Sequence, residues 1–160
     1  MTEFDKNTTC SFTGHRPEKL SMSEKECKEK LKTEIKKAIS DGFVTFISGM
    51  AKGIDIWAGE LVLELKKDYP HINLILAYPY KTFNVGTTPE EKKKISYLRE
   101  NSLDTYFIQT EYSISSFQKR NMWMVDHSSR VIAFFNGAKG GTLNTINYAR
   151  QENVETVIIN

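Results

Sequence analysis

Short apolar runs alternate with helix-type segments along almost the whole chain, and this alternation limits the possible folds more than any other feature of the sequence. The runs are continuous rather than alternating in polarity, which is typical of strands buried on both faces of a parallel sheet. They occupy residues 8–12, 44–48, 73–77, 105–109, 130–135 and 155–159. The pattern therefore predicts an α/β fold, a doubly wound and mainly parallel sheet of about six strands with helices on both faces.

Helix-type segments fill the intervals between these runs, and some of them carry clear start signals. Thr88 fits an N-cap, Pro89 the first helical position and Glu91 the partner in a capping box, so a helix is expected from there to about residue 101. Ser116 is predicted to cap the next helix. The residues from 78 to 87 are expected to form the loop between the third strand and its helix.

The composition fits a single globular domain covering residues 1–160. Of the 160 residues, 39% are hydrophobic and 26% are charged, a balance that can bury a core and argues against disorder. The most apolar run, residues 74–78, is far shorter than the roughly 18 residues of a membrane-spanning helix. The two cysteines cannot build a disulfide framework, and the polar first residues lack the apolar stretch of a secretory signal. We therefore expect a cytoplasmic protein.

The formal net charge is +2, which gives no general attraction to polyanions. We therefore expect neither nucleic acid nor membrane as a partner, and any anion site must be local. The sequence leaves open whether copies of the chain form a homo-oligomer. Three histidines and two cysteines stand far apart in the sequence, so we expect no metal site.

Three glycine-containing loops follow predicted strands, at residues 13–17, 48–53 and 137–142. Right-handed crossovers place all strand-to-helix loops of a parallel sheet at one edge, where open α/β folds bind ligands. Glycine lets backbone amides approach a ligand, and a following helix N-terminus favours an anion. None of the loops has the spacing of a dinucleotide fingerprint or a P-loop. The loops predict a nucleotide-like or phosphorylated ligand, although each glycine could also serve only a tight turn.

The candidate binding residues lie in or beside these loops. They are Thr13, Gly14, His15, Arg16, Ser48, Gly49, Met50, Ala51, Gly53, Asp55, Tyr78, Gly140, Gly141 and Thr142. Arg16 offers a fork of donors suited to phosphate, and His15 is assigned to binding only. Asp55 could accept hydrogen bonds from ribose hydroxyls or could only complement a helix dipole. Tyr78 could stack on a base.

The loop sequences also carry a family resemblance that covers about residues 8–160. Thr13-Gly14-His15-Arg16-Pro17, then Ser48-Gly49-Met50-Ala51-Lys52-Gly53-Ile54-Asp55, then Gly140-Gly141-Thr142 followed by Tyr148-Ala149, resemble the YpsA-like proteins of the SLOG superfamily. That superfamily groups the DNA-processing protein DprA with the LOG enzymes. The resemblance implies a Rossmann-like domain that binds a nucleotide or an ADP-ribose-like ligand, as a regulator or sensor in bacterial stress or cell division.

The chain departs from the enzymes of that superfamily at one position. LOG-type phosphoribohydrolases carry a Pro-Gly-Gly-x-Gly-Thr-x-x-Glu loop, and aligning its Gly-Thr with Gly141 and Thr142 puts Thr145 where the glutamate acts. Catalytic residues are therefore unknown. A phosphoribohydrolase (N-glycosidase) remains an alternative in which Glu60, Asp55 or Asp126 replaces that carboxylate.

Two further questions stay open at the level of the sequence. Single-stranded DNA binding through the lysine-rich residues 28–37 and 92–94 is a weaker alternative to nucleotide binding. Asp126 lies late in a predicted helix, where its charge opposes the helix dipole and calls for a compensating contact. Arg120 or Asn121 could supply that contact, or both could face solvent.

Overall fold

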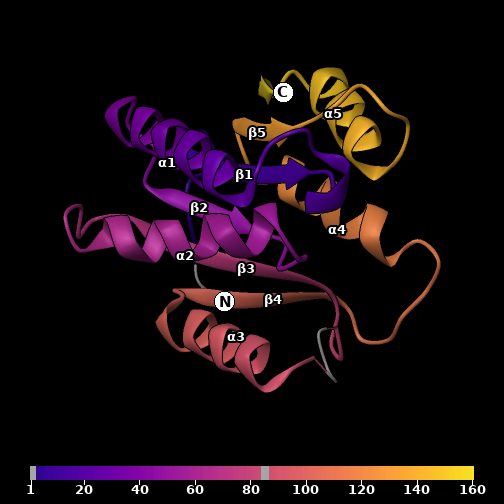
Figure 1. Ribbon diagram of the computed structural model, residues 1–160, viewed down its shortest axis with the longest axis horizontal. Helices are drawn as coiled ribbons and strands as arrows, with labels where there is room; N and C mark the ends of the chain where they lie inside the picture. Colours follow the sequence, from indigo (N-terminus) through magenta and orange to yellow (C-terminus); the bar gives the residue numbers. More distant parts are fainter. Residues whose placement is uncertain (1–2, 84–86) are drawn as a thin grey trace.

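A six-stranded parallel sheet forms the centre of the molecule in the computed structural model, which describes residues 3–83 and 87–160 (Figure 1). The strand order is β4-β3-β2-β1-β5-β6, and every neighbouring pair is parallel. The strands are β1 (Thr9–Gly14), β2 (Thr45–Ser48), β3 (Asn73–Tyr80), β4 (Asp104–Gln109), β5 (Arg130–Phe134) and β6 (Glu155–Ile159). The predicted doubly wound α/β architecture is confirmed.

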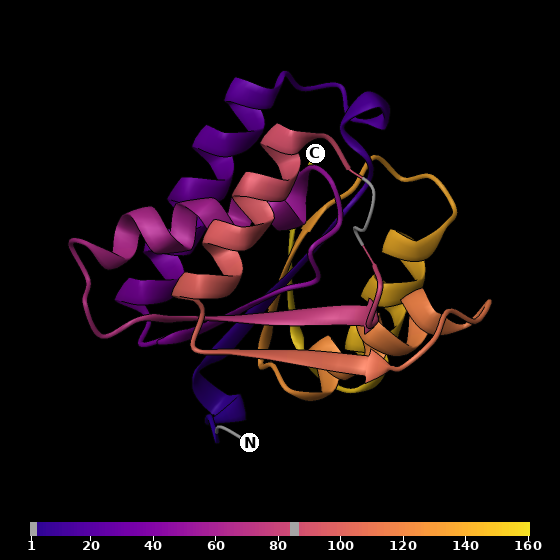
Figure 2. The ribbon, with the colours of Figure 1, turned by 90° about the horizontal axis from the view of Figure 1, so that it is seen from below.

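Five α-helices cover the two faces of the sheet (Figure 2). One face carries α1 (Glu24–Ser40), α2 (Ile54–Lys66) and α3 (Pro89–Asn101), and the other carries α4 (Ser116–Asp126) and α5 (Gly141–Gln151). Two short 3-10 turns, η1 (Lys6–Thr8) and η2 (Pro17–Lys19), flank β1. Within residues 3–83 and 87–160, no helix combines the length and apolar character needed to span a membrane.

The strand order reverses direction between β1 and β5. From β1 the chain adds β2, β3 and β4 on one side, and then β5 and β6 on the other. The strand-to-helix loops that follow β1 and β5 therefore diverge to opposite faces at this point. Open α/β folds bind ligands in the crevice outside the carboxyl ends of the strands at such a reversal.

Both faces of the central strands are buried, which explains their continuous apolar runs. Phe46, Leu74 and Leu76 belong to the large core beneath α1, α2 and α3. Ile47 and Ile75 belong to a smaller cluster with Met124 of α4 on the opposite face. Because successive strand residues point to opposite faces, a strand covered on both sides needs apolar residues at every position.

The helix start signals read from the sequence are only partly confirmed. The Thr88 side chain accepts a hydrogen bond from the Glu91 amide, and α3 ends at Asn101 as expected. Ser116, however, is the first residue of α4 and not its N-cap. Its hydroxyl donates to Gln109 Oε1 at 2.5 Å and accepts from the Ser113 amide at 2.7 Å, so it joins β4 to the loop before α4.

Strand β3 continues through Pro79 to Tyr80, so the expectation of a loop from residue 78 was wrong at its start. Residues 84–86 of that expected loop lie outside the described part of the chain. The pairing of β2 with β3 ends at Ser48 and Leu76, and beyond it β3 pairs only with β4. A proline is tolerated there because one side of the strand needs no ladder hydrogen bond.

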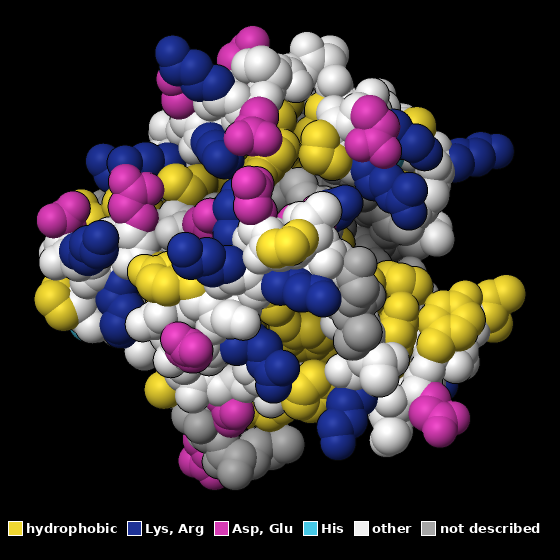
Figure 3. Space-filling view, turned by 60° about the horizontal axis from the view of Figure 1, so that its bottom comes forward, with side chains coloured by type: hydrophobic (Ala, Val, Ile, Leu, Met, Phe, Trp, Pro, Cys, Tyr) yellow, Lys and Arg dark blue, Asp and Glu magenta, His cyan; other side chains and the backbone are white. Residues whose placement is uncertain are grey.

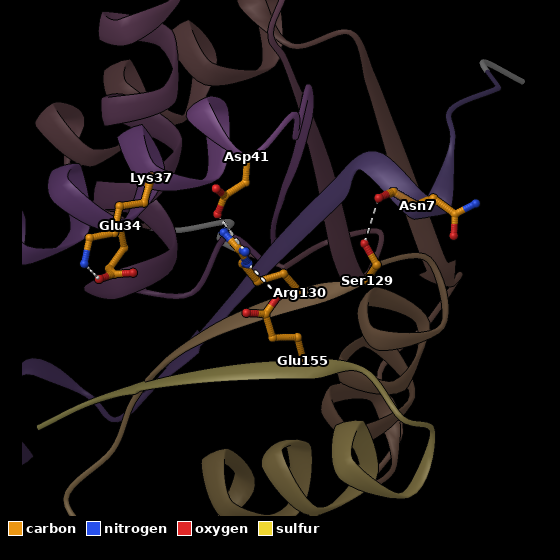
Figure 4. A network of polar contacts seen from close by, with 7 residues as sticks. All are labelled: Asn7, Glu34, Lys37, Asp41, Ser129, Arg130 and Glu155. Atoms are coloured by element: carbon orange, nitrogen blue, oxygen red, sulfur yellow. Dashed lines mark hydrogen bonds and ion pairs between the residues drawn. The ribbon is translucent and has the colours of Figure 1, made fainter.

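Arg130 joins three elements at the amino ends of the strands (Figure 4). Its guanidinium pairs with Glu155 at 2.8 Å and with Asp41 at 2.9 Å. It also lies 4.6 Å from the centroid of the Phe43 ring. The arginine therefore ties β5 to β6 and to the turn between α1 and β2.

Candidate functional site

The three glycine loops meet at one hollow of about 290 Å³ beyond the carboxyl ends of β1 and β5. The first loop contributes Thr13, Gly14, His15 and Arg16, and the second contributes Ala51 together with Asp55 from the start of α2. The third contributes Gly140, Gly141 and Thr142. The hollow therefore brings together most of the residues that the sequence pointed to, from segments far apart in the chain.

Other candidate residues shape the second loop from behind the hollow. The buried Ser48 hydroxyl donates to the Asp55 carbonyl at 2.7 Å and accepts from the Met50 amide at 3.2 Å. Met50 is fully buried and adopts a left-handed backbone conformation, with φ of 62°. These contacts hold the turn between β2 and α2 in place, and neither Ser48 nor Met50 lines the hollow.

Close approach of neighbouring segments requires glycine at two candidate positions. A Cβ on Gly14 would lie 2.6 Å from Ile54 Cγ1, and one on Gly53 would lie 2.7 Å from Pro17 Cγ. Gly53 also has φ of +91°, which disfavours any other residue. Both glycines allow the first two loops to pack against each other. Gly14 also lines the hollow, whereas Gly53 does not.

Tyr78 lies away from the hollow. Its side chain is 2% exposed and packs beside Phe83 and Phe107, with ring centroids 6.2 and 5.3 Å away. This burial follows from the extension of β3 beyond residue 77, which turns Tyr78 into a core residue. A base stacked on Tyr78 would have to displace that packing.

Arg120 of α4 is a residue of the hollow that sequence reasoning left undecided. It is only 4% exposed, and its Nη1 donates to the Gly49 carbonyl while its Nε donates to Asn121 Oδ1 at 2.8 Å. Ser116, Arg120 and Met124 all lie on the buried face of α4. Their spacing of four residues is a signal in the sequence from which this arginine could have been placed on the core side of the helix.

The charge of Arg120 faces a buried carboxyl across Gly49. A Cβ on Gly49 would lie 2.9 Å from Asp55 Oδ2 and 3.0 Å from Arg120 Nη1, so both groups flank this glycine. Burial raises the pKa of Asp55, while Arg120 and a hydrogen bond from the Ala51 amide act in the opposite direction. The site thus holds a donor and an acceptor side by side, which suits a ligand hydroxyl.

His15 also lines the hollow. Its ring stacks on Phe135 with centroids 5.3 Å apart, and its buried Nε2 has no hydrogen-bond partner among the described residues. Burial lowers the pKa of His15, the nearby Lys19 lowers it further, and the Asn136 side chain partly offsets the shift. A buried polar atom without a partner costs free energy, so a ligand that contacts Nε2 would recover it.

The start of α5 has no side-chain cap, in contrast to α1 and α3, which Ser23 and Thr88 cap. Gly140 at the N-cap has φ of 143°, and added Cβ atoms on Gly140 and Gly141 would meet no atom of the described part of the chain within 4 Å. A side chain at either position would therefore enter open space, and both glycines line the hollow. The basic side chains that line the hollow are Arg16, Lys19, Lys52, Arg120 and Lys139. Locally, the site favours an anion.

Only one of the three alternative carboxylates lines the hollow. Asp55 does, whereas Glu60 and Asp126 do not. Asp126 instead accepts a hydrogen bond from the Tyr148 hydroxyl at 2.6 Å, so neither Arg120 nor Asn121 compensates it. Thr145 donates to the Gly141 carbonyl at 2.8 Å. Within the described residues, no group of three or more His, Cys, Asp or Glu side chains could hold a metal ion.

Comparisons with known proteins match this chain to one protein family and to bacterial relatives. The YspA SLOG family (YpsA) matches residues 10–158. The uncharacterized SPbeta prophage-derived protein YoqJ of Bacillus subtilis is 34% identical over 137 residues, which are 78% of this chain and 80% of that protein. A UPF0398 protein of Streptococcus thermophilus is 24% identical over 108 residues, or 68% of this chain and 63% of that protein.

Solved structures of two DNA processing proteins have the same fold. DNA processing protein A of Helicobacter pylori, described with a single-stranded DNA binding mode, has a TM-score of 0.67 at 22% identity. DprA of Streptococcus pneumoniae has a TM-score of 0.64 at 15% identity. The matches cover 93% and 94% of this chain, but only 64% and 50% of those two chains. At these identities the likeness concerns the fold alone.

Proposed function

We propose, from the premise that this chain belongs to the YspA SLOG family, that its hollow binds a nucleotide or nucleotide-derived ligand such as ADP-ribose. The domain would act as a sensor or regulator, so that binding of the ligand changes how the protein acts on its partners. One observation carries the proposal: residues of three separate glycine loops line a single hollow, together with the side chains of Arg16, Asp55 and Arg120. This combination suits a phosphate joined to a sugar.

Each part of such a ligand finds a matching group. The N-terminus of α5, which no side chain caps, and the fork of Arg16 suit a phosphate, which is held best by preorganised donors and positive charge. Asp55 and Arg120 flank Gly49 and suit the two hydroxyls of a ribose, one as acceptor and one as donor.

Calorimetric titration with AMP, ADP and ADP-ribose tests the proposal. We expect Arg16→Ala to weaken binding about tenfold, the effect of losing one charge-assisted contact. Arg150→Ala is the matched control, because Arg150 is also an exposed arginine but lies near the end of α5 and does not line the hollow. Absence of binding for the whole panel, or equal affinities for wild type and Arg16→Ala, would refute the proposal.

A phosphoribohydrolase is a second candidate, favoured by the position of Asp55. A carboxyl with a raised pKa beside a sugar site could assist departure of the base while water adds to the anomeric carbon. Release of free base from nucleoside monophosphates would show this activity. Asp55→Asn should then abolish base release without abolishing nucleotide binding. No release by the wild type would remove the candidate.

Single-stranded DNA binding is a third candidate, because the structural neighbour from Helicobacter pylori is described with that activity. The lysine-rich stretches give it little support: Lys28, Lys32 and Lys37 pair with Glu24, Glu64 and Glu34. Figure 3 shows Lys and Arg interspersed with Asp and Glu over one face of the molecule, without a large basic patch. A salt-dependent gel shift that Arg16→Ala weakens and Lys32→Ala leaves unchanged would support binding at the hollow.

A further inference from the structure

A second cavity, of about 560 Å³, opens beside the hollow. Four residues line both of them, namely Arg16, Ala51, Lys52 and Phe117. The two spaces are therefore parts of one groove that runs from the start of α5 towards the loop after β3. A ligand that filled only the hollow would leave the larger part of this groove unused.

Aromatic side chains form one wall of the second cavity. Phe117 from the first turn of α4 and Phe83 from the loop after β3 both line it, with ring centroids 5.7 Å apart and ring planes at 79°. Tyr80 stands edge-on to each of them, at 5.6 Å from Phe83 and 6.1 Å from Phe117. These contacts hold the two phenylalanine rings in fixed orientations without covering them fully.

Phe117 stays exposed although it is large and apolar. Its side chain is 39% accessible, and Tyr112 and Ile114 in the preceding loop are more exposed still. Figure 3 shows hydrophobic side chains projecting at the side where Figures 1 and 2 place the loop between β4 and α4. An exposed ring that is held rigidly beside a charged site is typical of a stacking surface.

The Phe117 ring also contacts the charged side of the hollow through Arg120. The Arg120 guanidinium lies 5.7 Å from the Phe117 ring centroid, and Arg120 also donates to the Gly49 carbonyl beside Asp55. The aromatic wall and the charged hollow thus adjoin in one groove, with Phe117 and Arg16 lining both cavities. A nucleotide likewise joins an aromatic base to a charged phosphate through its ribose.

We propose that Phe117 and Phe83 form the subsite for the base of the bound nucleotide. The inference rests on the proposed function, because it assumes that the phosphate of the same ligand lies at the hollow. Stacking on a phenylalanine ring uses the π face that every base possesses. The subsite therefore discriminates nucleotides from sugar phosphates more strongly than it discriminates one base from another.

Calorimetry with AMP and with ribose 5-phosphate separates the base subsite from the phosphate site. We expect Phe117→Ala to weaken AMP binding about tenfold and to leave ribose 5-phosphate binding within about twofold of wild type. Phe117→Tyr should restore the affinity for AMP, because it keeps the ring. Phe107→Ala is the matched control. The exposed fraction of Phe107, 38%, is nearly the same as that of Phe117, but Phe107 lies on the edge strand β4 and lines neither cavity.

Each other outcome has a definite meaning. Equal losses for AMP and ribose 5-phosphate, or no loss for either, would overturn the base subsite while the proposed function stands. If the wild type binds none of AMP, ADP, ADP-ribose and ribose 5-phosphate, the proposed function is overturned and the subsite with it. Phe117-dependent binding of oligothymidylate, with AMP binding unaffected, would overturn the subsite in favour of strand binding. Thermal unfolding of each variant shows whether it is folded under the conditions of the titration.

Discussion

At the scale of single residues, Arg120 organises a site whose other parts come from separate loops. A guanidinium that is almost fully buried is costly unless hydrogen bonds and a counter-charge surround it. Here the Gly49 carbonyl and Asn121 Oδ1 accept its hydrogen bonds, and Asp55 supplies the opposite charge. The arginine thereby fixes the turn after β2 relative to α4. It also keeps a charged group ready at the hollow before a ligand arrives.

His15 gives a residue-scale prediction of pH dependence. Burial holds the pKa of His15 below its ordinary value of 6.5, so the folded state disfavours the protonated ring relative to the unfolded state. The contribution of neutral His15 to stability is therefore fully present above about pH 6.5 and is lost as the pH falls through the folded pKa. We expect the unfolding free energy of the wild type to decrease more steeply between about pH 7 and pH 5 than that of His15→Gln.

Urea denaturation at a series of pH values measures this difference. Parallel pH profiles for the wild type and His15→Gln would contradict the prediction. A ligand that places negative charge beside the ring should raise the pKa of His15, because an anion stabilises the imidazolium form. Proton NMR titration of the ring in the presence and absence of a bound nucleotide would detect that rise.

At the scale of elements, the glycines of the site separate into two kinds. Gly14 lies where the end of β1 meets the start of α2, and a side chain there would collide with Ile54. Gly141 is the first residue of α5, and a side chain there would enter open space beside the hollow. The first kind allows two elements to pack, whereas the second leaves a helix start accessible to a ligand. Sequence alone shows a glycine in both places and cannot distinguish the two roles.

Alanine substitutions test this division. Gly14→Ala should reduce the unfolding free energy by about 1–3 kcal/mol, because the new methyl group overpacks a strand against a helix. Gly141→Ala should leave stability unchanged or raise it slightly, because alanine is the better helix former. The same variant should weaken nucleotide binding, since its methyl group occupies the hollow. Urea denaturation and calorimetry on both variants would check this, and a stable Gly141→Ala protein with unchanged affinity would contradict it.

At the scale of the whole molecule, the sequence predicts the architecture well because the pattern is local. Runs such as residues 44–48 and 155–159 can be recognised as strands from their own residues, without knowing which strands pair with them. The length of β3 was missed because it depends on where β2 ends, which is a property of the sheet. Arg120 was left undecided because its contact with Gly49 joins residues 71 positions apart. The sequence therefore predicts which loops form the site, but it does not predict that Arg120 joins the second loop to α4.

The two ends of the sheet are expected to serve different purposes, and Arg130 allows a test. Its ion pairs with Asp41 and Glu155 lie at the amino ends of the strands (Figure 4), roughly 13 Å along β5 from the edge that carries the hollow. Because the arginine side chain is largely buried between half-exposed partners, Arg130→Ala should lower the unfolding free energy by about 1–3 kcal/mol. Nucleotide affinity should stay within about twofold of wild type at temperatures where the variant is folded. A loss of affinity as large as that of Arg16→Ala would instead mean that the ion pairs of Arg130 at one end of the sheet control the geometry of the loops at the other end.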